Sequence, residues 1–189
     1  MEEQLKKARK EHVQVIGCSH QNVLVHNRMM MQGFVMGNHE KVAALLKKYG
    51  VSLHLSGHSH LQHTAIDGNL MDICTESMVV WPLRYGVLQV DGKEMRYEKK
   101  DLGIFGEEAY ERFRQTVERG KASTFAQRDI SPEVEEQMME YAIQVNAAYY
   151  TGDEEGVASL KNDKRLGLWE SQVSDSFFYL YMQEIFRDR

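Results

Sequence analysis

The chain has 189 residues, of which 42% are hydrophobic and 27% are charged, and its formal net charge is -5. A chain of this length can hold one domain or two small ones, each with a packed core. The mildly acidic balance gives no electrostatic case for nucleic-acid binding, so no nucleic-acid partner is expected. No apolar run approaches the roughly 20 residues that span a bilayer, and the charged first segment MEEQLKKARKEH has no apolar signal region. We therefore expect a cytoplasmic protein without a membrane partner.

Cysteine, histidine and aspartate are unevenly distributed. The two cysteines, Cys18 and Cys74, have no paired spacing, so a disulfide framework is not expected and a reducing compartment fits. All eight histidines lie between His12 and His63, whereas the first aspartate is Asp67. The first third of the chain and the remainder therefore differ in composition, which suggests two regions with different functions.

The first part of the chain has the alternating helices and strands of an α/β domain. Residues 2–10 form an amphipathic helical pattern, and residues 12–18 have the apolar, β-branched character of a buried strand. Residues 40–50 have apolar side chains at helical spacing and end on a glycine. Residues 51–56 alternate between apolar and polar side chains, which predicts a further strand.

Short strands follow in the next stretch. Residues 61–100 contain three or four antiparallel strand patterns. Asp91-Gly92 lies between two alternating runs and is a hairpin turn signal, and Asp67-Gly68 is a second one. We therefore predict two β-hairpins here.

Helical patterns dominate the rest of the chain. Residues 107–119 are helical in pattern, and a longer helix begins at Ser131, an N-cap residue followed by Pro132 at the first helical position. The last segment, SDSFFYLYMQEIFRDR, is amphipathic and rich in aromatic residues. We predict two domains, an α/β domain over residues 1–101 and a small all-α bundle over residues 102–189.

The strongest candidate site follows two of the predicted strands. In LSGHSHLQH a strand ends at Ser56, Gly57 permits a tight turn, and His58 and His60 lie two positions apart. In an extended loop such residues face the same side, so both imidazoles can reach one metal ion or two adjacent ones. His20 also follows a strand. If the two strands are parallel neighbours, all three histidines converge at the sheet edge where open α/β sheets bind ligands.

The other histidines are weaker candidates for a metal site. His54 lies inside a strand pattern and is expected to be packed or half-exposed, His63 is out of phase with the motif, and His12 is expected at the surface. His26 is left open, because it could approach a substrate.

These motifs resemble those of a known family. The segments VQVIGCSHQN and LHLSGHSHLQ are similar to the last two metal motifs of calcineurin-like metallophosphoesterases, which use two metal ions in a four-layer α/β/β/α sandwich. The resemblance implies that His20 and His58 bind one metal ion and that His60 binds the other. The segments VNAAYYTGD, LGLWE and SFFYLYMQEI resemble the helical C-terminal domain of a bacterial subgroup described as cyclic-nucleotide phosphodiesterase-like. Both parts together cover nearly the whole chain.

The resemblance implies a phosphodiester or phosphomonoester substrate and a divalent metal cofactor, Mn, Zn or Fe. Other metal motifs of the family are missing, because the sequence contains no Asp-x-His and no Gly-Asp-x-x-Asp. Gly37-Asn38-His39-Glu40 matches a third motif of the family but follows His20, which is out of order, and an asparagine cap at a helix start explains it without a metal. Three neutral histidines do not offset two dications, so at most one metal ion is expected here.

The chain is therefore expected to be the C-terminal half of such a hydrolase, with little or no activity alone because the bridging carboxylate is missing. The N-terminal half is expected to come from another chain, or the sheet to associate with itself through its open edge as a homo-oligomer. The alternative is a non-catalytic interaction module with a vestigial or structural single-metal site. Whether the chain acts as an enzyme by itself stays open at this stage.

Overall fold

The computed structural model describes residues 1–126 and 128–187. The chain is mixed α/β with two separate sheets and divides into two compact units, Met1–Glu76 and Ser77–Arg189. The boundary between the compact units lies between Glu76 and Ser77. The predicted domain boundary lies later, between residues 101 and 102, so strands assigned to the predicted α/β domain belong to the second compact unit. Within the described part, no helix is long and apolar enough to cross a membrane.

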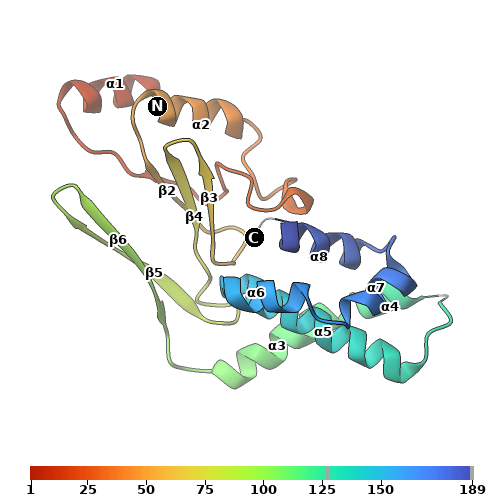
Figure 1. Cartoon of the computed structure of the whole chain (residues 1–189). Coiled ribbons are helices and arrows are strands. Elements are labelled where there is room, and N and C mark those ends of the chain that lie inside the picture. The colour runs from red at the N-terminus through yellow and green to blue at the C-terminus, as the bar shows by residue number, and fades with distance from the viewer. Residues whose placement is uncertain (127, 188–189) are drawn as a thin grey trace. The chain divides into compact units, whose positions relative to one another are not determined.

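The first unit, whose residues are all described, combines helices with a four-stranded sheet (Figure 1). The helices confirm the two predicted over residues 2–10 and 40–50. In chain order the elements are α1 (Glu2–Lys10), β1 (Gly17–Cys18), the 3-10 helix η1 (Arg28–Met30), α2 (His39–Lys48), β2 (Leu53–Ser56), β3 (His63–Asp67) and β4 (Leu70–Cys74).

The sheet has the strand order β1-β2-β4-β3. β1 pairs parallel with β2, β2 pairs parallel with β4, and β3 and β4 form an antiparallel hairpin. Gly68, with φ of 61°, makes the hairpin turn that the sequence predicted. The predicted strand over residues 12–18 is wrong in extent, because only Gly17 and Cys18 pair. Val13 still donates its N–H to the carbonyl of Ala8, so the chain is leaving α1 where the strand was expected.

One apolar core joins α1 and α2 to the sheet. Leu5 of α1 and Leu46 of α2 are buried against it, and burying a leucine fully contributes about 1.5–3 kcal/mol relative to exposing it. Val51 and Leu53, from the strand predicted over residues 51–56, are both buried as well. The buried members of this core are Leu5, Val23, Leu24, Ala43, Leu46, Val51 and Leu70.

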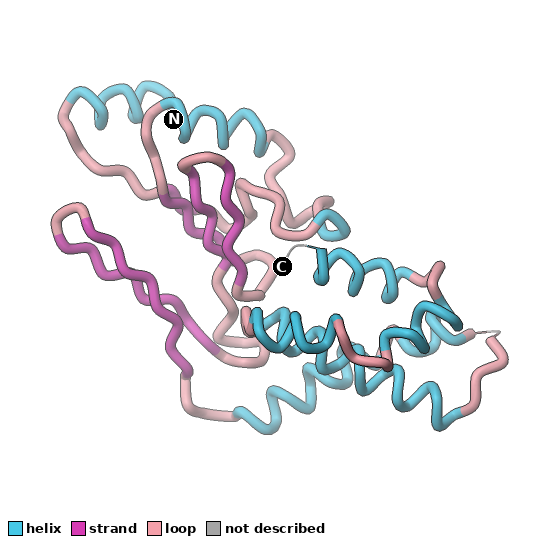
Figure 2. Tube along the Cα trace, in the orientation of Figure 1, coloured by secondary structure: helices cyan, strands magenta, loops and turns pink. Residues whose placement is uncertain are grey.

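The second unit begins with a two-stranded ribbon and continues as helices, as Figure 2 shows by colour. None of the side chains in the ribbon is fully buried. Gly92, with φ of 57°, makes its predicted turn. The elements of the second unit are β5 (Arg84–Asp91), β6 (Glu94–Asp101), α3 (Gly106–Glu118), α4 (Lys121–Phe125), α5 (Pro132–Tyr150), α6 (Glu154–Lys161), α7 (Leu166–Val173) and α8 (Phe177–Arg187).

The long helix α5 is the centre of the helical part, with α3, α6, α7 and α8 packed on it. It begins as the sequence predicted: the Ser131 side chain accepts a hydrogen bond from the N–H of Val134, and Pro132 is the first helical residue. Trp169 of α7 is fully buried and donates its Nε1–H to the carbonyl of Met138 at 3.0 Å. An indole placed in this way satisfies its polar group inside an apolar core.

Candidate metal centre

His20 and His58 come together at the carboxyl ends of β1 and β2. The two strands are parallel neighbours, which was the condition for convergence. Nδ1 of His58 lies 2.7 Å from Nε2 of His20, and the ring centroids are 4.5 Å apart. The predicted convergence of these two histidines is confirmed, whereas their binding of a metal ion stays a prediction.

The backbone fixes the turn that carries His58 to the end of β1. The carbonyl of His20 accepts hydrogen bonds from the N–H groups of Gly57 and His58, at 3.2 and 2.9 Å. The two strand ends are therefore tied together on the main chain as well as through the rings. The ring of Phe34 lies against His58 with centroids 5.1 Å apart and restricts it from a further side.

The facing nitrogens fit a shared metal ion. Two imidazole nitrogens on one tetrahedral ion, each about 2.0–2.1 Å from it, lie about 3.3 Å apart. The 2.7 Å gap between His20 and His58 would have to open by only about 0.6 Å to reach that separation. In the metal-free state the rings can share a proton at this distance. Metal binding to histidine replaces such a proton, which makes the affinity depend on pH.

His60 lies in the turn after His58 with a left-handed backbone, φ 53°, and donates its N–H to the carbonyl of Gly57. Burial lowers the pKa of His60, and the nearby His58 and His20 lower it further. This favours the neutral imidazole, which is the form that binds metals. Among residues 1–126 and 128–187, however, no three His, Cys, Asp or Glu side chains are grouped to hold one ion. The part of His60 in the site stays a prediction.

The remaining histidines have other surroundings. His12 is exposed, as expected. His26, 3% exposed, faces His63 across 2.9 Å between their Nδ1 atoms, and both rings are buried. A ring buried in this way cannot meet a substrate without rearrangement, so the structure gives no support to substrate binding by His26. His54 is buried too, where the sequence left it packed or half-exposed.

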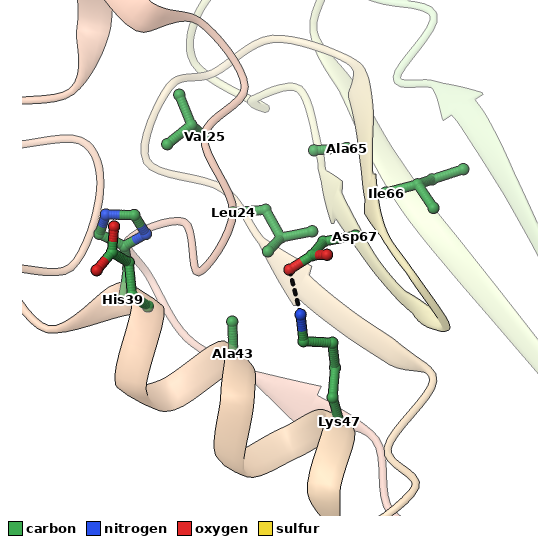
Figure 3. Close-up of a pocket in the computed structure, with 9 residues that line it drawn as sticks. Leu24, Val25, His39, Ala43, Lys47, Ala65, Ile66 and Asp67 are labelled. Carbon is green, nitrogen blue, oxygen red and sulfur yellow. Dashed lines mark hydrogen bonds and ion pairs between the residues drawn. The ribbon is translucent and has the colours of Figure 1, made fainter.

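His39 lies in the first turn of α2. It lines a cavity of about 410 Å³. Figure 3 shows it there together with Ala43 and with Lys47, which pairs with Asp67. Neither His20 nor His58 lines this cavity. Asn38 is the N-cap residue of α2, which agrees with the prediction that Gly37-Asn38-His39-Glu40 marks a helix start. Its side chain makes no capping hydrogen bond.

The cysteines are free, as the sequence suggested, and neither enters the histidine pair. Cys18 is exposed and Cys74 is buried. Burial raises the pKa of the Cys74 thiol, although hydrogen bonds from Asn22 and from backbone N–H groups act in the opposite direction. The thiol is therefore kept neutral, whereas a metal ligand would have to be a thiolate.

The sequence interpretation missed Asp72, which lies in the middle of β4 and is fully buried. Its burial raises its pKa, but the facing His26 and His54 and the N–H of Leu24 outweigh burial and hold the pKa well below its usual range. The carboxylate is therefore ionised inside the core. A signal was present, because a single aspartate inside the apolar stretch LMDIC is rare unless it is paired.

Gly17 in β1 also has a role that the sequence did not reveal. A Cβ atom at this position would lie 2.5 Å from Cδ2 of His54, which is closer than side chains approach. The missing side chain therefore leaves room for the His54 ring beside β1.

The fold and the site define a mixed α/β chain with a histidine pair at the carboxyl edge of two parallel strands, followed in the sequence by a helical part. A family model described as the C-terminal domain of cyclic nucleotide phosphodiesterase matches residues 92–189, just over half of the chain. The chain belongs to this family. The match confirms the phosphodiesterase-like character expected for the C-terminal part. No curated protein matches the chain at a significant level.

Proposed function

We propose that this chain supplies histidine ligands to the metal centre of a phosphoesterase that hydrolyses phosphodiesters or phosphomonoesters. The family assignment over residues 92–189 supports a phosphoesterase-like function. The observation that carries the proposal is the pair of facing nitrogens of His20 and His58, 2.7 Å apart at the end of two parallel strands. The first unit is then part of the four-layer metallophosphoesterase sandwich.

In this proposal, the facing nitrogens of His20 and His58 hold the ion, and His60 contributes from the adjacent turn. When bound, a divalent ion such as Mn, Zn or Fe supplies charge that polarises a phosphoryl oxygen and lowers the pKa of a coordinated water. The hydrogen bonds from Gly57 and His58 to the carbonyl of His20 hold the two strand ends together before the ion arrives. Such preorganisation keeps the ligands near their bound geometry.

The carboxylates of a two-metal centre have to come from elsewhere. Asp72 is buried and already accepts hydrogen bonds from backbone and side-chain donors, so it does not bridge two ions. The sequence contains no Asp-x-His and no Gly-Asp-x-x-Asp. We propose that this chain binds at most one ion, and that another polypeptide segment supplies the bridging carboxylate and the active two-metal centre.

Metal content tests the ligand assignment. Purified wild type should bind Zn²⁺ or Mn²⁺ by titration calorimetry and elemental analysis, and the double variant His58→Ala/His60→Ala should lose it. His39→Ala is the matched control, because His39 lies in the same unit but at the start of α2, and it should keep the metal. Equal metal content in wild type and in the double variant would remove the assignment.

Activity tests the missing carboxylate. With bis-p-nitrophenyl phosphate and added Mn²⁺, the chain alone should hydrolyse at least ~10³-fold more slowly than a complete family member, because no bridged nucleophilic water is formed. Faster, metal-dependent turnover that survives repurification and disappears in His58→Ala would contradict this expectation.

Assembly follows from the position of β1. It is the outer strand of the sheet, and its second edge is unpaired within the first unit. An open edge is a template for another strand, so we propose that the chain either self-associates there or pairs with a chain that carries the missing motifs. Light scattering coupled to gel filtration should show a dimer or a complex. A monodisperse monomer at micromolar concentration, with no copurifying chain, would contradict this.

A second candidate is a non-catalytic module with a single structural or vestigial metal site. It is favoured by one observation, that the described residues include no grouping of three ligands for one ion. The two candidates differ in what happens on mixing with a chain that carries the Asp-x-His and Gly-Asp-x-x-Asp motifs. Metal-dependent phosphodiesterase activity should appear in the mixture for the enzyme part and should not appear for the module.

A further inference from the structure

We propose that Asp72 is the positioning residue of the histidine pair: its carboxylate, through one buried hydrogen-bond network, fixes the chain segments that carry His20 and His58. The network has three branches, each traced below through described residues. Its effect on metal affinity rests on the proposed function, whereas its effect on the placement of the two rings does not.

The first branch runs directly to the loop after His20. The N–H groups of Val23 and Leu24 donate to Oδ2 of Asp72 at 2.8 and 2.9 Å. These residues lie only three and four positions beyond His20 in the sequence. The carboxylate therefore fixes the path of the chain directly after His20. Both N–H groups are buried, so water does not take the place of the carboxylate as their acceptor.

The second branch runs to the residue before His20. Oδ1 of Asp72 lies 2.9 Å from Nδ1 of His54, and Nε2 of the same ring lies 3.0 Å from Oγ of Ser19. The His54 ring thus connects the buried carboxylate on β4 to the end of β1. Gly17 leaves the room that this ring needs. His20 is then held from both sides along the chain.

The order Asp72, His54, Ser19 is that of a serine-hydrolase triad, but the protons are placed differently. Oγ of Ser19 lies 2.6 Å from the carbonyl of Gln21, which can only accept a hydrogen bond. The hydroxyl hydrogen therefore points to Gln21 and not to Nε2 of His54. Ser19 is held in place by this arrangement and is not activated as a nucleophile.

The third branch runs to the turn that carries His58. Ser56 donates its hydroxyl to Oδ1 of Asp72 at 2.9 Å and accepts a hydrogen bond from Nδ2 of Asn22 at 2.7 Å. Oδ1 of Asn22 accepts in turn from the hydroxyl of Ser59 at 3.0 Å. Ser59 is the residue between His58 and His60. All members of this branch are buried. One carboxylate is therefore connected both to the segment that carries His20 and to the turn that carries His58.

The test is Asp72→Asn in the full chain, with two readouts. An asparagine keeps the shape but replaces one acceptor by a donor, so it cannot serve all the groups that donate to the carboxylate. Cobalt affinity by titration calorimetry and by the Co²⁺ absorption spectrum should fall, by up to the roughly 10–100-fold that is lost when a direct hydrogen-bond partner of a metal ligand is removed. Without metal, the NMR cross-relaxation between the rings of His20 and His58 should be lost.

Asp67→Asn is the matched control. It removes the same charge from the same sheet, but Asp67 is exposed on β3 and pairs with Lys47. Its cobalt affinity should stay within about twofold of wild type, and its ring–ring cross-relaxation should remain. If Asp72→Asn does not fold by circular dichroism, Ser56→Ala takes its place. That variant breaks only the third branch and should disturb the resonances of His58 and His60 more than those of His20.

The outcomes separate the two proposals. Loss of ring–ring cross-relaxation in a folded Asp72→Asn or Ser56→Ala protein, with Asp67→Asn unchanged, supports the positioning role. Wild-type cross-relaxation and wild-type cobalt affinity in a folded Asp72→Asn protein, or in Ser56→Ala where it replaces that variant, overturn it. If the wild type binds neither cobalt nor Zn²⁺ or Mn²⁺, the proposed function fails, and the metal-free NMR comparison still decides whether Asp72 positions the rings.

Discussion

The two compact units of the chain differ in what fills their interiors. Beside its apolar core, the first unit buries a group of ionisable and polar side chains, including His26, His54, His63 and Asp72. The second unit is filled mainly by apolar and aromatic side chains from α5, α7 and α8, although Asn146 and Glu184 are buried there too. Its fully buried large residues are Trp169, Tyr141, Tyr149, Met138, Ile143, Met182, Ile185 and Val145.

The difference teaches what each interior is able to do. An apolar core gains stability from burial and tolerates changes that conserve volume. A buried polar network gains less, because each group gives up hydration, and an unsatisfied member costs more than a lost contact. In return it holds its members in one geometry. The first unit is therefore suited to placing His20 and His58, and the second to holding helices together.

The largest effect is expected from removing the carboxylate. Asp72→Ala leaves two backbone N–H groups, His54 and Ser56 without their acceptor. The first unit should lose about 3–5 kcal/mol, the range found when one partner of a buried ionic interaction is removed. Hydrogen exchange measured by mass spectrometry should show lost protection in Met1–Glu76 and retained protection in α5 to α8. Equal loss in both units would contradict the comparison.

A cavity in the second unit should have the opposite pattern. Met138→Ala removes a fully buried side chain of α5 and should cost about 2–4 kcal/mol. Protection should fall in the helices and remain in the sheet of the first unit. Leu180→Ala on α8 is the matched control, because Leu180 is 46% exposed, and it should change stability by less than about 0.5 kcal/mol.

Acid should destabilise the first unit selectively. The pKa of Asp72 is lowered from 3.8 in the folded state, so the stability it contributes is fully present above pH 3.8 and is lost as the pH falls toward the lower folded value. The first unit should lose about 1.4 kcal/mol for each pH unit below that point, until the folded carboxyl also titrates. Hydrogen exchange at pH 4 and pH 3, corrected for intrinsic rates, measures this. A first unit no more acid-sensitive than the second would rule it out.

The smallest effect should come from the charge pair at the surface of the first unit. Lys47 and Asp67 are in contact, but the Asp67 side chain is 52% exposed. Asp67→Asn should therefore change stability by no more than about 0.5 kcal/mol. Urea unfolding followed by circular dichroism is sufficient. A loss comparable to that of Asp72→Ala would mean that the position of the carboxylate in the fold, buried or exposed, does not decide its contribution.

The sequence predicted most elements whose cause is local. Ser131 and Pro132 begin α5, and Asp91-Gly92 turns the ribbon, because capping and turn chemistry depend on a few adjacent residues. The prediction of a strand over residues 12–18 was wrong in extent. The local pattern is apolar, but which residues pair is decided by β2, some 35 residues later in the chain.

The candidate site was predictable only in part. The motif around His58 indicated the histidine pair, and the parallel pairing of β1 and β2 brings His20 to it. The network behind it was not predictable. Asp72 accepts from the N–H groups of Val23 and Leu24, 49 and 48 positions earlier, and no local pattern encodes contacts over such separations.

The close approach of His54 to Gly17 has a consequence for how this sequence can vary. A scan of all substitutions should find position 17 closed to every side chain as long as position 54 keeps its imidazole, because even a methyl group would meet the ring. Gly37 and Gly167 have open space around the same atom position and should accept alanine. The residue types at positions 17 and 54, 37 residues apart, therefore depend on each other. In a redesign of the chain, the glycine and the imidazole have to be kept together or replaced together.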